Sequence, residues 1–183
     1  GYEPIPISAG SFNIYPQLNV STYAVDNLYA TSSNTEGDVA LMVVPSITAQ
    51  STWSEHSLAV TASGRARFWA DNSSENSVAA NLNVVSGYDI NSKLSWVNQG
   101  SYRHEVQNRT DVGALRTSTE PVTYDVFYFN SQLIYSFGRV RISGSAGAQK
   151  LAYSDVVTDP DVGAQPLIPD RSLLIYELRG EYA

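Results

Sequence analysis

Residues 38–69 read DVALMVVPSITAQSTWSEHSLAVTASGRARFW and contain two alternating runs joined by a tight turn near Ser54. In the first run the odd positions are mostly apolar, and the even positions become polar towards the turn. In the second run one set of alternate positions is apolar or small, and the opposite set carries Arg65 and Arg67. An alternation with a period of two over this length indicates long β-strands.

The composition excludes several classes of protein and of site. The chain of 183 residues carries a formal net charge of −7, whereas a general nucleic-acid binder needs a basic face. It contains no cysteine and only two histidines, His56 and His104, which we expect at opposite ends of the strands. We therefore predict no nucleic-acid partner, no cofactor and no metal site. No apolar run approaches the roughly 18 residues of a transmembrane helix, but a transmembrane strand needs only about 9–11 residues of alternating polarity.

The same alternation recurs along the chain and predicts eight strands. They cover the ranges 11–22, 38–53, 58–69, 78–89, 94–105, 127–136, 139–149 and 174–182. Their connections are in turn long, short, medium, short, long, short and long, with the long loops at 24–37, 106–121 and 155–170. In an up-and-down meander this order places every tight turn at one end of the strands. Outer-membrane barrels sort their loops in this way, and Greek-key sandwiches have no reason to do so.

We therefore predict an all-β, antiparallel, up-and-down transmembrane β-barrel. Because alternation alone does not tell which face is inside, a small soluble barrel or a sandwich is the alternative. Strand length favours the membrane barrel, since soluble strands usually have about 5–6 residues. Aromatic residues beside the tight turns also favour it, because a girdle at the water–lipid boundary would place them there. The predicted interfacial aromatics are Trp53, Tyr88, Tyr135 and Phe137.

Two prolines interrupt the first two predicted strands. Pro16 and Pro45 come close together when these strands pair across the intervening loop. Proline cannot donate to the hydrogen-bond ladder and is normally confined to edges or bulges. We therefore expect the two prolines to share a local bulge.

Two segments resemble a known family. They are FNIYPQLNVSTYAVDNLY (12–29) and DVALMVVPSITAQSTWSEHSL (38–58), which are similar to the start of the barrel in the outer-membrane β-barrel porins of type 2. The resemblance is carried by Pro16, Leu18, Asn27, Tyr29, Asp38, Pro45, Trp53, Ser54 and His56. It implies a barrel in the outer membrane of a Gram-negative bacterium, usually with more than eight strands. We therefore expect residues 1–183 to be a single barrel domain that is truncated at both ends.

The charged residues of the strands fall on the less apolar face, which would line the lumen. The lumen-facing candidates are Arg65, Arg67, Arg103, Arg139, Arg141, Glu177 and Arg179. One interpretation is a basic stripe, formed by the arginines at 65, 67, 139 and 141, that favours anionic solutes. The other interpretation is a set of interior ion pairs that satisfies a polar lumen.

The predicted function is a passive, porin-like channel for small polar or anionic solutes, embedded in outer-membrane lipids. A pore for polysaccharide secretion and a surface adhesin or receptor are alternatives, and a soluble carbohydrate-binding β-sandwich is a more distant one. The sequence contains no Gly-rich phosphate loop, no histidine-containing triad and no defined carboxylate pair. A nucleophile needs a base within reach, so no enzymatic activity is predicted.

Overall fold

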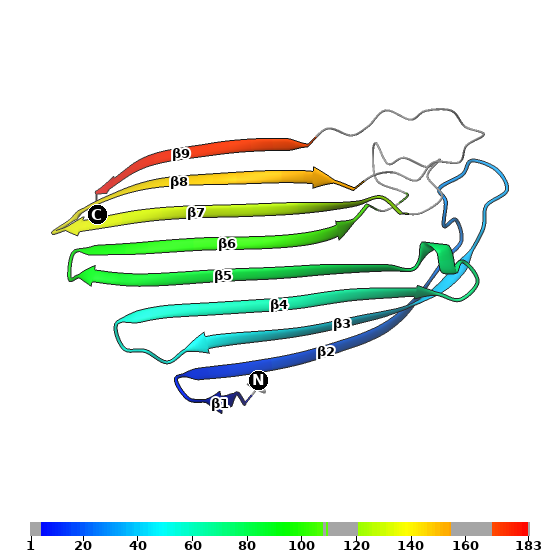
Figure 1. The fold of residues 1–183 in the computed structure, drawn as a ribbon, viewed down its shortest axis with the longest axis horizontal. Coiled ribbons are helices and arrows are strands. Elements are labelled where there is room, and N and C mark those ends of the chain that lie inside the picture. The colour runs from blue at the N-terminus through cyan, green and yellow to red at the C-terminus, as the bar shows by residue number, and fades with distance from the viewer. Residues whose placement is uncertain (1–4, 108, 110–120, 155–169, 183) are drawn as a thin grey trace.

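One antiparallel sheet makes up most of the computed structural model, which describes residues 5–107, 109, 121–154 and 170–182. In these ranges nine strands follow one another across the sheet in sequence order (Figure 1). They are β1 (Ile7–Ala9), β2 (Phe12–Val25), β3 (Asp38–Ser51), β4 (His56–Trp69), β5 (Ser77–Asn91), β6 (Leu94–Val106), β7 (Thr123–Phe137), β8 (Val140–Tyr153) and β9 (Arg171–Tyr182). A short 3-10 helix, η1 (Ser73–Glu75), precedes β5. The order confirms the predicted up-and-down meander.

The two faces of the sheet differ in polarity because side chains alternate along each strand. On the apolar face, large hydrophobic side chains such as Leu18, Phe129 and Leu133 are exposed. The polar face carries mainly amide, hydroxyl, tyrosine and arginine side chains, and its register pairs include Asn13 with Gln50. The described residues form one sheet with no second sheet packed on it, so the β-sandwich alternative is wrong. Within the same ranges no helix is long and apolar enough to cross a bilayer.

The strands are staggered as in a barrel wall. One row of paired residues crosses the sheet through Asn13, Gln50, Ala59, Val85, Gln99, Asn130, Gly147 and Ile175. The start of β2 and the end of β9 lie at the same end of the sheet. Measured from that end, Asn13 lies one residue from Phe12 of β2, whereas Ile175 lies seven residues from Tyr182 of β9. The row therefore shifts by six residues in seven strand steps. A shear of about one residue per strand corresponds to a strand tilt of about 36°, which is within the usual range for transmembrane barrels.

Short and long connections lie at opposite ends of the strands, as Figure 1 shows. The short-turn end has the connections 10–11, 52–55, 92–93 and 138–139, and the long-loop end has 26–37, 70–76, 107–122 and 154–170. In the 138–139 turn Gly138 has a φ of +58°, which glycine adopts without a steric cost. This sorting confirms the predicted order of connections, although 110–120 and 155–169, the greater part of two predicted loops, lie outside the described residues.

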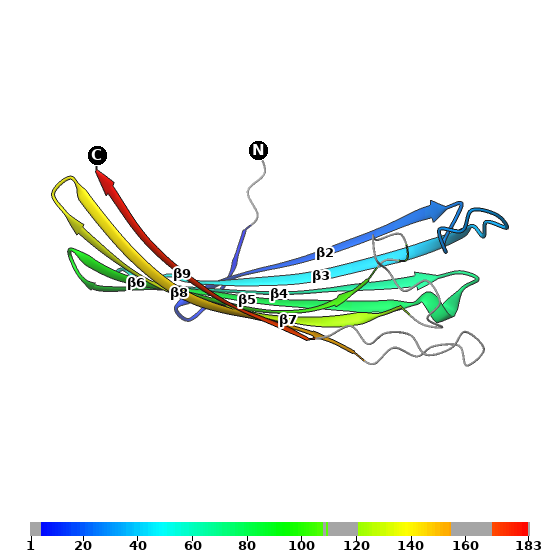
Figure 2. The same cartoon turned by 90° about the horizontal axis from the view of Figure 1, so that it is seen from above.

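The sheet is curved, as Figure 2 shows. It is open because β1 and β9 do not pair with each other. Several boundaries differ from the prediction, among them the start of β7 at Thr123, the end of β8 at Tyr153 and the start of β9 at Arg171. A ninth strand, β1, precedes the eight that alternation predicts, and it pairs with only three residues of β2. β2 also continues to Val25 beyond the predicted limit of residue 22, because Tyr23 and Val25 keep the alternation while pairing with β3.

The prediction of a bulge at the two prolines is wrong. β2 and β3 pair without interruption over their whole length, with Pro45 opposite Leu18 and Pro16 opposite Ile47. Towards β4 the pairs at residues 44 and 45 are missing, but the register is the same on both sides of this gap. Pro45 therefore removes a donor from the ladder without adding a residue to the strand. The register shift of the sheet lies instead between β5 and β6, near Asp89.

Candidate pore-lining face

The polar face carries six of the seven predicted lumen-facing residues. They are Arg65 and Arg67 on β4, Arg103 on β6, Arg141 on β8, and Glu177 and Arg179 on β9. Arg139 is not on a strand as predicted, because Phe137 pairs with Val140 and leaves Arg139 in the turn. Arg67 is near the long-loop end of its strand, whereas Arg141 is at the short-turn end. The arginines therefore form two groups rather than one stripe.

Two arginines of this face form ion pairs, as the second interpretation of the sequence predicts. Arg65 Nη2 lies 3.2 Å from Glu105 Oε2, although β5 separates their two strands. The small, buried Ala79 of β5 lies opposite Arg65 and leaves room for the pair. On β9, Arg179 Nη2 lies 2.8 Å from Glu181 Oε1. Because the side chains of both pairs are partly exposed, each pair contributes little to stability.

Arg67 has a different environment, beside two aromatic rings at the long-loop end. Its guanidinium carbon lies 5.8 Å from the ring centre of Tyr23 and 6.0 Å from that of Trp69, within the range of a cation–π attraction. The two rings pack edge to face, with their centroids 5.6 Å apart. They meet because Ala40, which pairs with both residues, is the small residue between them.

The connection 26–37 packs against the same end of the polar face. Leu28 is buried in a cluster with Ala40 and Trp69, and its N–H donates to the carbonyl of Glu36 at 2.7 Å. The Asn27 side chain accepts from the Thr31 N–H at 3.0 Å and donates to the Thr31 carbonyl at 2.8 Å. These local bonds hold the connection in a shape that presents Leu28 to the sheet.

Tyr29 of this connection and Asp38, the first residue of β3, both contact the connection between β4 and β5. The Asp38 carboxylate accepts from the backbone N–H and from the side-chain amide of Asn72, each at 3.0 Å. The Tyr29 hydroxyl lies 3.2 Å from the Asn72 side-chain oxygen, to which it donates. Burial raises the pKa of Tyr29 above the usual tyrosine value, and the neighbouring carboxylates of Glu75 and Glu36 raise it further. The phenol is therefore neutral at physiological pH.

A buried ion pair joins η1 to the segment that follows β6. Arg109 Nη2 lies 2.6 Å from Glu75 Oε1, and Arg109 Nε lies 3.1 Å from Glu75 Oε2. The side chains are 7% and 5% exposed, so water screens the attraction only slightly. The sequence pattern does not predict this pair, because both residues lie in connections, where alternation carries no signal.

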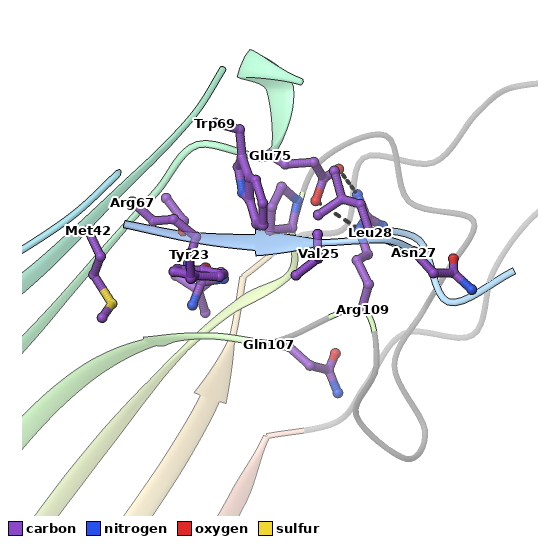
Figure 3. A pocket seen from close by; sticks show the side chains of 13 residues that line it. Tyr23, Val25, Asn27, Leu28, Met42, Arg67, Trp69, Glu75, Gln107 and Arg109 are labelled. Carbon is purple, nitrogen blue, oxygen red and sulfur yellow. Dashed lines mark hydrogen bonds and ion pairs between the residues drawn. The ribbon is translucent and has the colours of Figure 1, made fainter. Parts of the chain in front are cut away.

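These groups surround a cavity of about 380 Å³ at the long-loop end (Figure 3). Its apolar walls include Tyr23, Leu28, Val25, Met42, Trp69 and Val106. Its charged residues, among those that the structure describes, are Arg67, Arg109 and Glu75. Gln107 also lines the cavity, and its side-chain oxygen is buried with no hydrogen-bond partner among the described residues.

The four predicted interfacial aromatics gather at the short-turn end and are 45–60% exposed. Trp53 packs on Phe12 with ring centroids 5.6 Å apart, Tyr88 stacks on His56 at 4.0 Å, and Lys93 lies 5.2 Å from the ring centre of Phe137. Tyr135 is opposite Leu94 on the apolar face. They lie where an interfacial girdle is expected, and their contact with lipid headgroups stays a prediction.

A polar network, which the sequence pattern does not predict, interrupts the apolar face near the long-loop end. Asp125 Oδ1 lies 2.8 Å from the Tyr102 hydroxyl and 2.9 Å from His104 Nδ1. On the same face, Lys150 Nζ lies 3.7 Å from Asp170 Oδ2. His104 is thus at the opposite end of the strands from His56, as predicted. No group of three histidine, aspartate or glutamate side chains within the described ranges could hold a metal ion.

Comparison with known proteins gives one match. The model of the family described as "Putative beta-barrel porin 2" matches residues 1–182. No curated protein and no solved structure shows a significant match to the chain. The family match includes every strand of the sheet and the three connections that line the cavity.

Proposed function

The chain belongs to this family of beta-barrel porins, whose barrels lie in the outer membrane, and we propose that it forms a passive pore for small polar or anionic solutes. The host would be a Gram-negative bacterium. In outer-membrane barrels the longer loops are extracellular, so the long-loop end with its cavity is the outer mouth. The role of such a protein is transport rather than catalysis.

The division between the two faces of the sheet supports this proposal most directly. Large apolar side chains are exposed along one face, from Leu18 on β2 to Leu178 on β9. In lipid this exposure stabilises the barrel, whereas in water it would be costly. The opposite face carries amides, hydroxyls and arginines, which suit a water-filled lumen. Arg65, Arg67 and Arg103 lie at the proposed outer mouth, where their charge would attract anions.

Conductance measurements test the proposal. The folded barrel, recognised by a gel mobility that changes on heating, is added to planar lipid bilayers, and current is measured under a salt gradient. A pore gives stepwise conductance with a preference for anions. Replacing Arg65 and Arg67 together by Gln should lower that preference, and Arg141→Gln with Arg179→Gln is the matched removal of two charges at the other end. A folded barrel that carries no current would exclude the pore and favour the adhesin or receptor.

Secretion of polysaccharide is the second candidate, and the amides of the polar face favour it. Asn13, Gln50, Gln99 and Asn130 lie on one row across the sheet. Amide side chains both donate and accept hydrogen bonds, as saccharide hydroxyls require. Swelling of proteoliposomes in oligosaccharides of increasing length distinguishes the two transport roles. A sharp cut-off at the disaccharides supports the general pore, and continued permeation by longer chains supports secretion.

A further inference from the structure

A polar patch interrupts the apolar face on β5, β6 and β7. Ser86, Asn98 and Ser131 are paired across these strands, so their side chains lie on one face of the sheet. The exposed Leu133 shares this face, because it lies two residues from Ser131 on β7 and side chains alternate along a strand. Such a patch is unusual on a surface that the proposed barrel turns towards lipid.

The patch lies at the depth of the lipid chains. Counted from the short-turn end, Asn98 lies four residues from Leu94, where β6 begins, and Ser131 lies six residues from Phe137, where β7 ends. With a rise of about 3.3 Å per residue and a tilt of about 36°, these side chains are about 11–16 Å from that end. The apolar band of a transmembrane barrel is about 25 Å tall. The lipid around the patch therefore offers neither donors nor acceptors.

Asn98 lacks a hydrogen-bond partner for its side-chain oxygen. This atom is buried and unpaired within the part of the chain that the structure describes. The indole N–H of Trp96, on the same strand, is satisfied, since it donates to Ser131 Oγ at 2.7 Å. An unpaired amide in an apolar environment is costly. Because the last torsion of an asparagine side chain is broad, the amide of Asn98 can turn to a donor that approaches from outside the sheet.

The surface beside the patch has a groove and a ridge. The groove, of about 640 Å³, is lined by Ser131 of the patch and by Gly144 and Ala146 of β8. Trp96 and Leu133 border it and are 42% and 50% exposed, so these large side chains stand beside two small residues. A ridge beside a groove is self-complementary, because a two-fold rotation places the ridge of each copy in the groove of the other.

From the unpaired amide, its depth and the shape of the surface, we propose that this patch is the contact between two copies of the chain. Copies inserted in the same direction are related by an axis along the membrane normal, which leaves each residue at its own depth. The patch of one copy therefore meets the patch of the other. An asparagine amide both donates and accepts, so Asn98 of each copy satisfies Asn98 of the other. The contact rests on the proposed function for the membrane location of the barrel, but not for conduction.

Cysteine cross-linking in lipid vesicles tests the contact, because the chain contains no cysteine of its own. Ser86, Asn98 and Ser131 are replaced by Cys one at a time, and the position nearest to the axis should give a disulfide-linked dimer on oxidation, since a disulfide needs Cα atoms within about 7 Å. Leu18→Cys is the control that should stay monomeric. Leu18 lies six residues from Phe12 at the short-turn end of β2, which is the same depth as Ser131 on a distant strand.

Two outcomes of the cross-linking refute the proposal. A patch that is covered by lipid gives no dimer at any of the three positions. Equal cross-linking of the Leu18→Cys control indicates random collision of barrels in the bilayer. The same variants are oxidised in intact outer membranes, where a cross-link to a different protein in place of the dimer assigns the patch to another partner and also refutes the proposal.

The dissociation constant of the dimer, measured by energy transfer between labelled copies in vesicles, tests the amide and the groove. Asn98→Leu should raise it at least about tenfold, because the amide pair is lost. Ala146→Phe fills the groove and should also raise it. Ala62→Phe is the matched control that should leave it unchanged, since Ala62 pairs with Ile47 and Leu82 of the apolar face and both alanines lie six residues from the short-turn end of their strands.

The proposal fails if Asn98→Leu leaves the dissociation constant unchanged, or if Ala62→Phe raises it as much as Ala146→Phe does. The heat-dependent gel shift verifies that each variant is folded. Conductance is measured separately on the same preparations. Monomers that conduct refute only the contact, and dimers that carry no current refute only the pore.

Discussion

Removing one partner of the Glu75–Arg109 ion pair should destabilise the protein substantially. The guanidinium donates to both carboxylate oxygens, at 2.6 and 3.1 Å, and both side chains are buried. A single substitution leaves a buried charge without its counterion, which costs about 3–5 kcal/mol. Because the pair joins two connections rather than two strands, local opening of the long-loop end relieves part of this cost. We therefore expect Arg109→Met to lower the free energy of unfolding by about 2–4 kcal/mol.

A double-mutant cycle with Glu75→Gln measures the interaction itself. Unfolding by urea from lipid vesicles is followed by tryptophan fluorescence, because Trp69 is in the adjacent cluster. The double variant should cost less than the sum of the single ones by about 1.5 kcal/mol or more. The exposed Arg65–Glu105 pair, treated in the same way, should give a coupling of about 0–1 kcal/mol. Additive costs at Glu75 and Arg109 would refute the reasoning from burial and geometry.

Three further predictions concern the membrane, the mouth and the turns. Leu82→Arg on the apolar face should cost about 2–4 kcal/mol in vesicles, whereas Asn83→Arg on the polar face should cost little; equal costs would mean that the faces are wrongly assigned. The folded chain holds the phenol proton of Tyr29 more tightly than the unfolded chain, because the pKa of Tyr29 is raised in the fold. The stability that this difference in pKa contributes is present below a pH of about 10 and is lost as the pH rises through the raised pKa. Urea midpoints should therefore fall in alkali more for the wild type than for Tyr29→Phe. Asn91→Ala removes two side-chain bonds to the β5–β6 turn, at 2.9 and 3.0 Å, and should lower stability by about 1 kcal/mol, read from the urea midpoint.

The protein has two parts that are built differently, the barrel wall and its outer mouth. The buried ion pair and the cavity both belong to the mouth. The wall repeats one local rule, with apolar side chains on one face and polar ones on the other. The mouth is built by connections that contact that wall at Leu28 and at Asp38 of β3, and the Glu75–Arg109 pair joins two of these connections to each other. Variants of the wall should therefore act mainly on insertion and conductance, and variants of the mouth on local stability.

The sequence by itself determined the strands, their faces and the sorting of their connections. Alternation is a local property, because each successive side chain points to the opposite face whatever its partners are. Residues 38–69 therefore predicted two paired strands, with Arg65 and Arg67 on the polar face. The tight turns were equally readable, since they interrupt the alternation for only a few residues.

Only the tertiary structure decided which residues meet across strands and connections. Register depends on pairing between distant segments, and a shift of one residue moves every contact. The neighbours of Arg67, the Arg65–Glu105 pair and the unbroken ladder at Pro45 follow from that register. Glu75 and Arg109 come from connections with no periodic signal, and only the folded chain brings them together. The wall was therefore predictable from local geometry, whereas the cavity depends on contacts between segments far apart in the sequence.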